Sequence, residues 1–329
     1  MNTTPERLHD LVQRHAALAL PDQADRLAEP ASASANDLAY AAARRLGFIE
    51  PDAAAIARAW QRRSEREGRL ASASASAPAS DWNPNWPTEA QDFGLLDPPT
   101  EAAPAPPFAP CPAELGLYAV LPSAAWVQRM AQAGVPTLQL RFKSGHAAAV
   151  RAEVQAAAAA VQAVASASGQ PPSRLFINDH WQAALEAGAY GVHLGQEDLD
   201  TLPPDALPAL RRAGLRLGLS THGYAELLRA ARLRPSYLAL GAVYPTTLKA
   251  MATAPQGSAR LHAYAQLLRG LLPTVAIGGI GPEQLPAVAA SGVGSFAAVR
   301  ALTSAASPEA AAHALMQHWA RLRGAGAKA

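Results

Sequence analysis

Polar residues interrupt this apolar sequence at the ends of short β-rich runs, and several are types that bind phosphate. Gln139, Arg141 and Lys143 end one such run, where period-2 alternation predicts that they point to the same side. Arginine binds phosphate oxygens through a fork of hydrogen bonds, and lysine binds them as a point charge. The pattern predicts a site for a phosphorylated ligand, and a solvated strand end is the alternative.

Carboxylates follow the next two runs, with Asp179 after one and Asp198 after the other. Two carboxylates at neighbouring strand ends can share Mg²⁺, which takes one or two protein carboxylates together with substrate phosphates. Each of them also precedes a predicted helix, so the alternative is a pair of helix N-caps. Because Arg141 and Lys143 accompany them, we favour the metal site.

Two histidines and one polar loop lie near the same predicted strand ends. His193 lies within a strand and is assigned to the pocket wall, because a lone strand histidine is more often a structural hydrogen-bonding residue than a base. His222 receives no role. Thr246, Thr247 and Lys249 follow the sixth run and supply two hydroxyls and a third cation.

The last two runs end in residues suited to a phosphate cradle. Gly279 ends the seventh run and Val299-Arg300 ends the eighth. Backbone amides after the last two strands of a (β/α)₈ barrel recurrently bind phosphate, and glycine permits a close approach of the ligand. Glycine also simply ends strands, so this signal is weak by itself.

Eight β-rich runs alternate with helical stretches, which predicts a (β/α)₈ TIM barrel of class α/β. An open, doubly wound sheet is the structural alternative. The runs are 116–121, 137–142, 174–178, 191–195, 215–220, 237–243, 274–279 and 295–299. Active sites of such barrels lie at the carboxyl ends of the strands, where the polar residues gather.

The composition predicts three regions. Residues 1–70 form a helical N-terminal region of unknown role, with helices starting near Pro5, Asn36 and Pro51 and a thin apolar core. Residues 71–112, rich in Ala, Ser and Pro, behave as a linker. The barrel occupies residues 113–325 and contains every candidate site residue, so we expect it to keep its activity without the first 110 residues.

Charge and cysteine content exclude several classes of protein. With 28 basic and 26 acidic residues among 329, the net charge of +2 predicts no nonspecific nucleic-acid binding. Cys111 is the single cysteine, which excludes an intramolecular disulfide and a cysteine-rich zinc site. No long apolar run and no leader-like N-terminus are evident, so we expect a cytoplasmic protein that does not bind membranes. The oligomeric state is left open.

Seven segments of the predicted barrel resemble thiamine phosphate synthases in order and spacing, over about residues 113–323. The most specific are Phe176-Ile-Asn-Asp179 and Gly191-Val-His-Leu-Gly-Gln-Glu-Asp198. The others are 139–143, 218–222, 244–246, 251–257 and 276–280. The resemblance implies that a pyrimidine diphosphate and a thiazole phosphate condense to thiamine phosphate and pyrophosphate, with Mg²⁺ as cofactor.

The resemblance also assigns residues to each ligand. The pyrimidine diphosphate is held by the residues matching Gln139, Leu140, Arg141, Phe142, Lys143, Asn178, Ser220 and Lys249. The thiazole phosphate is held by those matching Thr246, Thr247, Leu248, Gly279, Val299 and Arg300. Mg²⁺ is held by those matching Asp179 and Asp198. Arg141, Lys143 and Lys249 are expected to stabilise the leaving diphosphate, because stabilising developing charge is usually the largest catalytic contribution.

Two positions depart from the family pattern. Leu248 stands where the family usually has a second hydroxyl, and Arg300 stands where it usually has a small polar residue. Both concern the thiazole phosphate, for which Arg300 can replace the lost contacts with a charge-assisted hydrogen bond. Alternative functions are a thiazole tautomerase-like isomerase and a non-catalytic thiazole phosphate sensor.

Overall fold

The chain divides into two compact units. The computed structural model describes residues 4–20, 29–30, 32, 34–73, 83–96, 105–246 and 253–326. The first unit, here the N-terminal unit, combines residues 1–104 with residues 223–232, and the barrel unit combines residues 105–222 with residues 233–329. One short segment of the predicted barrel therefore belongs with the N-terminal helices.

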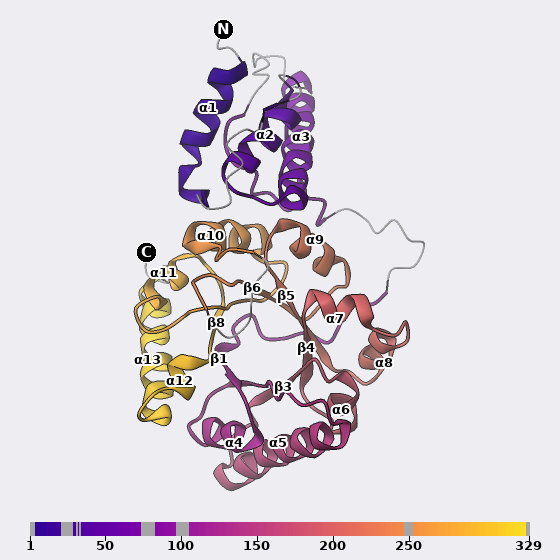
Figure 1. The fold of residues 1–329 in the computed structure, drawn as a ribbon, viewed down its shortest axis with the longest axis vertical. Helices are drawn as coiled ribbons and strands as arrows, with labels where there is room; N and C mark the ends of the chain where they lie inside the picture. Colours follow the sequence, from indigo (N-terminus) through magenta and orange to yellow (C-terminus); the bar gives the residue numbers. More distant parts are fainter. Residues whose placement is uncertain are drawn as a thin grey trace. The chain divides into compact units, whose positions relative to one another are not determined.

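The barrel unit is built on a closed barrel of eight parallel strands in sequence order, and β8 pairs with β1 to close it (Figure 1). This confirms the predicted (β/α)₈ barrel. The strands are β1 (Gly116–Leu121), β2 (Thr137–Leu140), β3 (Arg174–Asn178), β4 (Gly191–Leu194), β5 (Arg216–Thr221), β6 (Tyr237–Leu240), β7 (Thr274–Ala276) and β8 (Ser295–Ala298).

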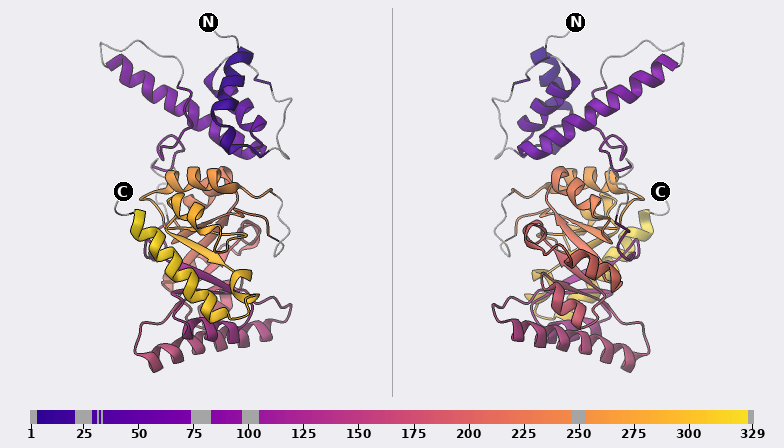
Figure 2. Two further views of the ribbon diagram at one scale, coloured as in Figure 1. Left: turned by 90° about the vertical axis from the view of Figure 1, so that its left-hand side faces the viewer. Right: turned by 90° about the vertical axis from the view of Figure 1, so that its right-hand side faces the viewer.

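Helices cover the outside of these strands, as Figure 2 shows most clearly for the long helices α5 and α13. Helix α5 turns Val150, Val154 and Val161 inward, which accounts for its place against the barrel despite its alanine-rich sequence. The helices of this unit are α4 (Ala124–Gln132), α5 (Ala147–Ser168), α6 (Trp181–Glu186), α7 (Gln196–Thr201), α8 (Ala206–Arg212), α10 (Gly257–Leu268), α11 (Leu285–Ala290), α12 (Arg300–Thr303) and α13 (Pro308–Gly326).

Five strands end earlier than the sequence predicts, β4 and β8 by one residue and three others by two or three. The runs 137–142, 237–243 and 274–279 end as strands at Leu140, Leu240 and Ala276. The residues that follow each strand leave the hydrogen-bonded ladder and enter the loops at its carboxyl end. Apolar sequence alone does not distinguish a paired strand from the extended loop that continues it.

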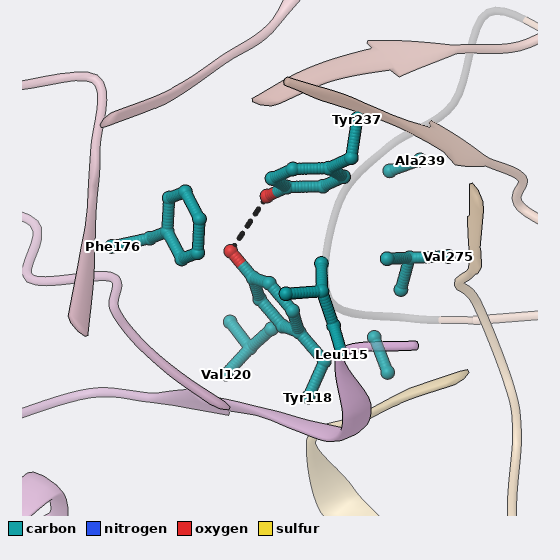
Figure 3. Packing of buried hydrophobic residues seen from close by; sticks show 8 residues of the cluster. Leu115, Tyr118, Val120, Phe176, Tyr237, Ala239 and Val275 are labelled. Atoms are coloured by element: carbon teal, nitrogen blue, oxygen red, sulfur yellow. Dashed lines mark hydrogen bonds between the residues drawn. The ribbon is translucent and has the colours of Figure 1, made fainter. Parts of the chain in front are cut away.

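Aromatic side chains fill part of the barrel interior (Figure 3). Tyr118 from β1, Phe176 from β3 and Tyr237 from β6 pack together, with ring centroids 5.2–5.8 Å apart. Gly218 of β5 makes room for Tyr237, because a Cβ at that position would lie 2.1 Å from the Tyr237 ring. The barrel interior is therefore filled by packed side chains and is not an open pore.

The N-terminal unit contains α1 (Thr4–Arg14), the 3₁₀ helix η1 (Ala16–Leu18), α2 (Ala35–Arg45), α3 (Glu50–Ala73) and α9 (Tyr224–Arg232). The first three α-helices occupy the predicted places. Ser34 caps α2 by accepting a hydrogen bond from the Asp37 amide at 3.2 Å.

The core of this unit is larger than the thin apolar core that the sequence predicts. Trp86 donates a hydrogen bond from Nε1 to the Tyr224 hydroxyl at 2.9 Å, and Phe93 stacks on the Tyr224 ring at 4.9 Å. Phe48 and Trp60 complete the aromatic cluster around Trp86. Residues 83–96, which the sequence assigns to a linker, thus supply core side chains.

The last part of the predicted linker belongs to the barrel unit. Phe108 is 3% exposed, and its amide donates to the Arg234 carbonyl at 3.0 Å. Ser236 donates a hydrogen bond to the Ala109 carbonyl at 2.6 Å. The structured part of this unit therefore begins before Ala113. None of the described helices is long and apolar enough to cross a membrane.

Candidate active site

A cavity of about 740 Å³ lies in the barrel unit at the carboxyl ends of the strands. It gathers residues from the loops after all the strands from β2 to β8, as expected for this fold. The predicted site residues that line it are Gln139, Arg141, Lys143, Asn178, Asp179, His193, Asp198, Ser220, Thr246, Gly279, Val299 and Arg300.

The predicted cations after β2 lie in this cavity. Gln139, Arg141 and Lys143 all line it, so their predicted common direction is confirmed. The Arg141 amide donates to the Leu121 carbonyl at 2.8 Å, which holds the chain beside β1 one residue beyond β2. Gln139 donates from Nε2 to Asn178 Oδ1 at 2.7 Å and links the ends of β2 and β3.

The two residues that alternate with Gln139, Arg141 and Lys143 do not line the cavity. Leu140 is buried in the core, and the Phe142 carbonyl lies 3.2 Å from His180 Nε2. Neither side chain lines the cavity. The assignment of Leu140 and Phe142 as ligand-binding residues therefore has no support from their side chains, because alternation along an extended chain sends neighbours to opposite sides.

The predicted metal ligands Asp179 and Asp198 face the same cavity. Asp179 has a left-handed backbone with φ 63°, and its amide donates to the His193 carbonyl at 3.0 Å. Burial and then the neighbouring Asp198 raise the pKa of Asp179 to about 6. Asparagine and aspartate are the residues that tolerate this backbone conformation best after glycine.

Asp198 lies in the first turn of α7 and does not precede the helix, whose N-cap is Gly195. Its Oδ2 accepts a hydrogen bond from the Gly195 amide at 2.7 Å, which closes the first turn of α7. Its interaction with Asp179 nevertheless brings the two carboxylates together. The N-cap of α6 is His180, so neither Asp179 nor Asp198 is the N-cap that the sequence offered as the alternative.

The carboxylate pair fits a hard divalent cation. A shared positive charge stabilises two carboxylates that repel each other, and it would lower the pKa of Asp179 against the effects of burial and of Asp198. Among the described residues, no group of three or more His, Cys, Asp or Glu side chains is placed to hold a metal. A cation held by two carboxylates needs further oxygen ligands, as Mg²⁺ typically takes from phosphate and water.

His193 and Ser220 form the inner wall of the cavity. His193 Nε2 lies 2.9 Å from Ser220 Oγ, and its Nδ1 lies 2.7 Å from the Tyr237 hydroxyl. Burial lowers the pKa of His193 to about 4, so the ring is neutral near pH 7. The neutral imidazole agrees with the predicted wall role.

Glycines line the opposite side of the cavity after β7. Gly278 and Gly279 have φ values of 102° and 65°, and a Cβ on Gly279 would lie 2.6 Å from the Pro245 carbonyl oxygen. Only glycine allows this close approach of two backbones. Thr246, Val299 and Arg300 line the same cavity, and Arg300 begins helix α12.

Part of the predicted site lies outside the described residues, namely Thr247, Leu248 and Lys249. The cavity also contains residues that sequence reasoning missed. His222, which received no role, lines it next to Thr221, and Gln284 accepts a hydrogen bond from the Gly281 amide at 3.0 Å. The position of Thr221 and His222 at the end of a predicted strand was the available signal, whereas nothing in the sequence marked Gln284.

Comparison with protein families gives one match across this region. A family described as thiamine monophosphate synthase matches residues 117–302. Thiamine-phosphate synthase of Neisseria meningitidis serogroup A is 51% identical over 212 residues, which cover 64% of this chain and 98% of that protein. Thiamine-phosphate synthase of Cronobacter sakazakii is 54% identical over 200 residues, which cover 61% of this chain and 90% of that protein.

A solved structure supports the same fold. Thiamine phosphate pyrophosphorylase from Pyrococcus furiosus aligns with a TM-score of 0.52 at 24% identity, covering 63% of this chain and 96% of that chain. These alignments span nearly the whole of each relative and less than two thirds of this chain. Much of the sequence therefore lies outside the alignments.

Proposed function

This chain belongs to the thiamine monophosphate synthase family, and we propose that its cavity condenses 4-amino-2-methyl-5-(diphosphooxymethyl)pyrimidine with a thiazole phosphate. The products are thiamine phosphate and pyrophosphate, so the chain is a transferase of thiamine biosynthesis. The observation that carries the proposal is the gathering of Arg141 and Lys143 with the paired carboxylates Asp179 and Asp198 in one cavity.

The reaction breaks the bond between the pyrimidine methylene carbon and the diphosphate oxygen, and the diphosphate leaves with the electron pair. The thiazole nitrogen then forms a new bond to the electron-poor carbon. Negative charge develops on the leaving diphosphate, so Arg141 and Lys143 would stabilise it most at the transition state. No side chain is required as a nucleophile in this scheme.

Magnesium is part of the proposal. Asp179 and Asp198 would hold Mg²⁺, and diphosphate oxygens would supply further ligands. Bound there, Mg²⁺ would supply Lewis-acid stabilisation of the leaving diphosphate. Asp198 remains tied to the Gly195 amide through Oδ2, so it offers its other oxygen to the metal.

The two substrates would occupy different sides of the cavity. Gln139 and Asn178, joined by their hydrogen bond, and Ser220 would hold the pyrimidine part. Gly279 and the exposed guanidinium of Arg300 would hold the thiazole phosphate. Placing the thiazole nitrogen against the pyrimidine methylene would then be a matter of proximity and orientation.

The site argues against the tautomerase, and only a turnover assay distinguishes the synthase from the sensor. A tautomerase that isomerises one monophosphate does not require the paired carboxylates Asp179 and Asp198 beside the cations Arg141 and Lys143. A non-catalytic sensor would bind thiazole phosphate without turnover. Small phosphorylated molecules are therefore the proposed partners, and a cytoplasmic location remains an expectation from the sequence.

The experiment mixes the purified protein with Mg²⁺ and both substrates and measures thiamine phosphate and pyrophosphate. We expect equal amounts of the two products. Asp179→Asn and Asp198→Asn should each lower turnover by a factor on the order of 10², because each removes a charged ligand. Asp205→Asn, on an exposed aspartate at the start of α8, is the matched control and should keep wild-type turnover.

Three results would contradict these assignments. Isomerisation of the thiazole phosphate alone would favour the tautomerase, and binding without product would favour the sensor. Near-normal Mg²⁺-dependent turnover in both carboxylate variants would contradict the assignment of Asp179 and Asp198 as metal ligands.

A further inference from the structure

A chain of buried hydrogen bonds runs from the barrel interior to the cavity. Tyr118 and Tyr237 join through their hydroxyls at 2.7 Å, as Figure 3 shows. The Tyr237 hydroxyl also lies 2.7 Å from His193 Nδ1, and His193 Nε2 lies 2.9 Å from Ser220 Oγ. Ser220 lines the cavity, so the chain has one buried end and one end at the ligand.

The buried end has no alternative partner. Leu115, Val120, Phe176 and Val275 surround the tyrosine pair with apolar groups. Among the residues that the structure describes, Tyr237 is the one hydrogen-bond partner of the Tyr118 hydroxyl. If Tyr118 accepted the bond, its own hydrogen would be buried without an acceptor, which is costly. Tyr118 must therefore donate to Tyr237.

The direction of donation from Tyr118 to Tyr237 fixes the direction of every other hydrogen bond in the series. Tyr118 and Tyr237 are at most 2% exposed and His193 is 5% exposed, so each hydroxyl hydrogen needs an acceptor within these hydrogen bonds. Because Tyr237 accepts from Tyr118, its own hydrogen is available for His193 Nδ1. A neutral imidazole that accepts at Nδ1 carries its hydrogen on Nε2. His193 then donates to Ser220.

We propose that the Tyr118–Tyr237 pair sets the tautomer of His193 and thereby makes Ser220 a hydrogen-bond donor toward the ligand. With its oxygen already accepting from His193, the Ser220 hydroxyl directs its hydrogen into the cavity. Tyr118, Tyr237 and His193 act as positioning residues for Ser220. The matching ligand atom is an acceptor, such as a diphosphate oxygen or a ring nitrogen of the pyrimidine, and this part rests on the proposed function.

The opposite tautomer would give a different site. If His193 carried its hydrogen on Nδ1, Nε2 would accept from Ser220, and the serine could offer only lone pairs to the cavity. Lone pairs would repel an anionic diphosphate. Gly218 is required for this series of hydrogen bonds, because a Cβ there would lie 2.3 Å from the Tyr237 hydroxyl and displace it.

The direct test reads the tautomer without reference to activity. The full-length protein is labelled with ¹⁵N-histidine, the His193 signals are assigned by comparison with His193→Gln, and the protonated ring nitrogen is identified by NMR. We expect hydrogen on Nε2 between pH 6 and pH 8. Hydrogen on Nδ1 in the wild-type protein would overturn the proposal.

Kinetics provide the second measurement. Tyr237→Phe keeps the ring but removes the bond to Nδ1, and we expect it to raise the KM for the pyrimidine diphosphate roughly two- to tenfold, the range for one neutral hydrogen bond. The KM for the thiazole phosphate should not change. Ser220→Ala should add little in the Tyr237→Phe background, because both variants break the same chain.

Tyr190→Phe is the matched control. Tyr190 also packs on Phe176, at 5.4 Å, but its hydroxyl lies outside the chain, so this variant should keep wild-type kinetics. Fully additive effects of Tyr237→Phe and Ser220→Ala would contradict the proposal. If the wild-type protein makes no thiamine phosphate, the proposed function fails, whereas the NMR result still decides the tautomer.

Discussion

Substitution of Phe108 tests whether the segment before the first strand is a linker or part of the barrel unit. Its side chain is 3% exposed, and the Arg211 guanidinium lies 4.3 Å from the ring centroid. Its amide bond to the Arg234 carbonyl is independent of the side chain. Phe108→Ala therefore removes the ring contacts and leaves the backbone contacts in place.

The expected loss follows from these contacts. Replacing a buried phenylalanine with alanine costs about 3–5 kcal/mol, and a cation–π contact contributes about 0.5–1 kcal/mol of stability. Arg211 Nε is buried without a hydrogen-bond partner among the described residues, and water admitted by the smaller side chain would satisfy it. That gain offsets part of the loss, so we expect Phe108→Ala to destabilise the protein by about 3 kcal/mol.

Urea unfolding followed by circular dichroism and by activity measures this loss. Phe108→Leu keeps most of the apolar volume and should cost less than about 1.5 kcal/mol. Leu96→Ala, at a side chain that is 58% exposed, is the control for a surface position and should have almost no effect. A loss below about 1 kcal/mol for Phe108→Ala would refute the reasoning and restore the linker predicted from the sequence.

Three further predictions concern other sites. The pKa of Asp179 is raised to about 6, so its ionisation weakens the metal-free fold as pH rises through that value. Asp179→Asn should therefore raise Tm more at pH 8 than at pH 5, and an equal gain at both pH values would contradict this. Arg300→Ser should raise the KM for thiazole phosphate by roughly tenfold, since a charged hydrogen bond contributes about 1.5–3 kcal/mol, and an unchanged KM would show that Arg300 does not bind the phosphate. Tyr224→Phe leaves Trp86 Nε1 without its partner and should lower the free energy of unfolding by about 1–3 kcal/mol, whereas no change in a urea titration would argue against the hydrogen bond.

The sequence was sufficient for the barrel and for most of the polar residues that line its cavity. Eight β-rich runs separated by helical stretches required a parallel sheet, and polar residues at their ends had to meet where parallel strands end. Alternation then placed Gln139, Arg141 and Lys143 on one side. These features depend on local periodicity, which is visible in the order of residues.

Tertiary structure decided the contacts between residues far apart in the chain. Tyr118 and Tyr237 are 119 residues apart, and only closure of the barrel brings their hydroxyls together. The grouping of α9 with the N-terminal helices rests on Trp86 and Tyr224, which are 138 residues apart. The Pro-rich segment around Phe108 has the composition of a linker, and only the neighbours supplied by the folded barrel make it part of the core. Composition and periodicity describe a residue's local preference, whereas burial depends on which distant surfaces fold against it.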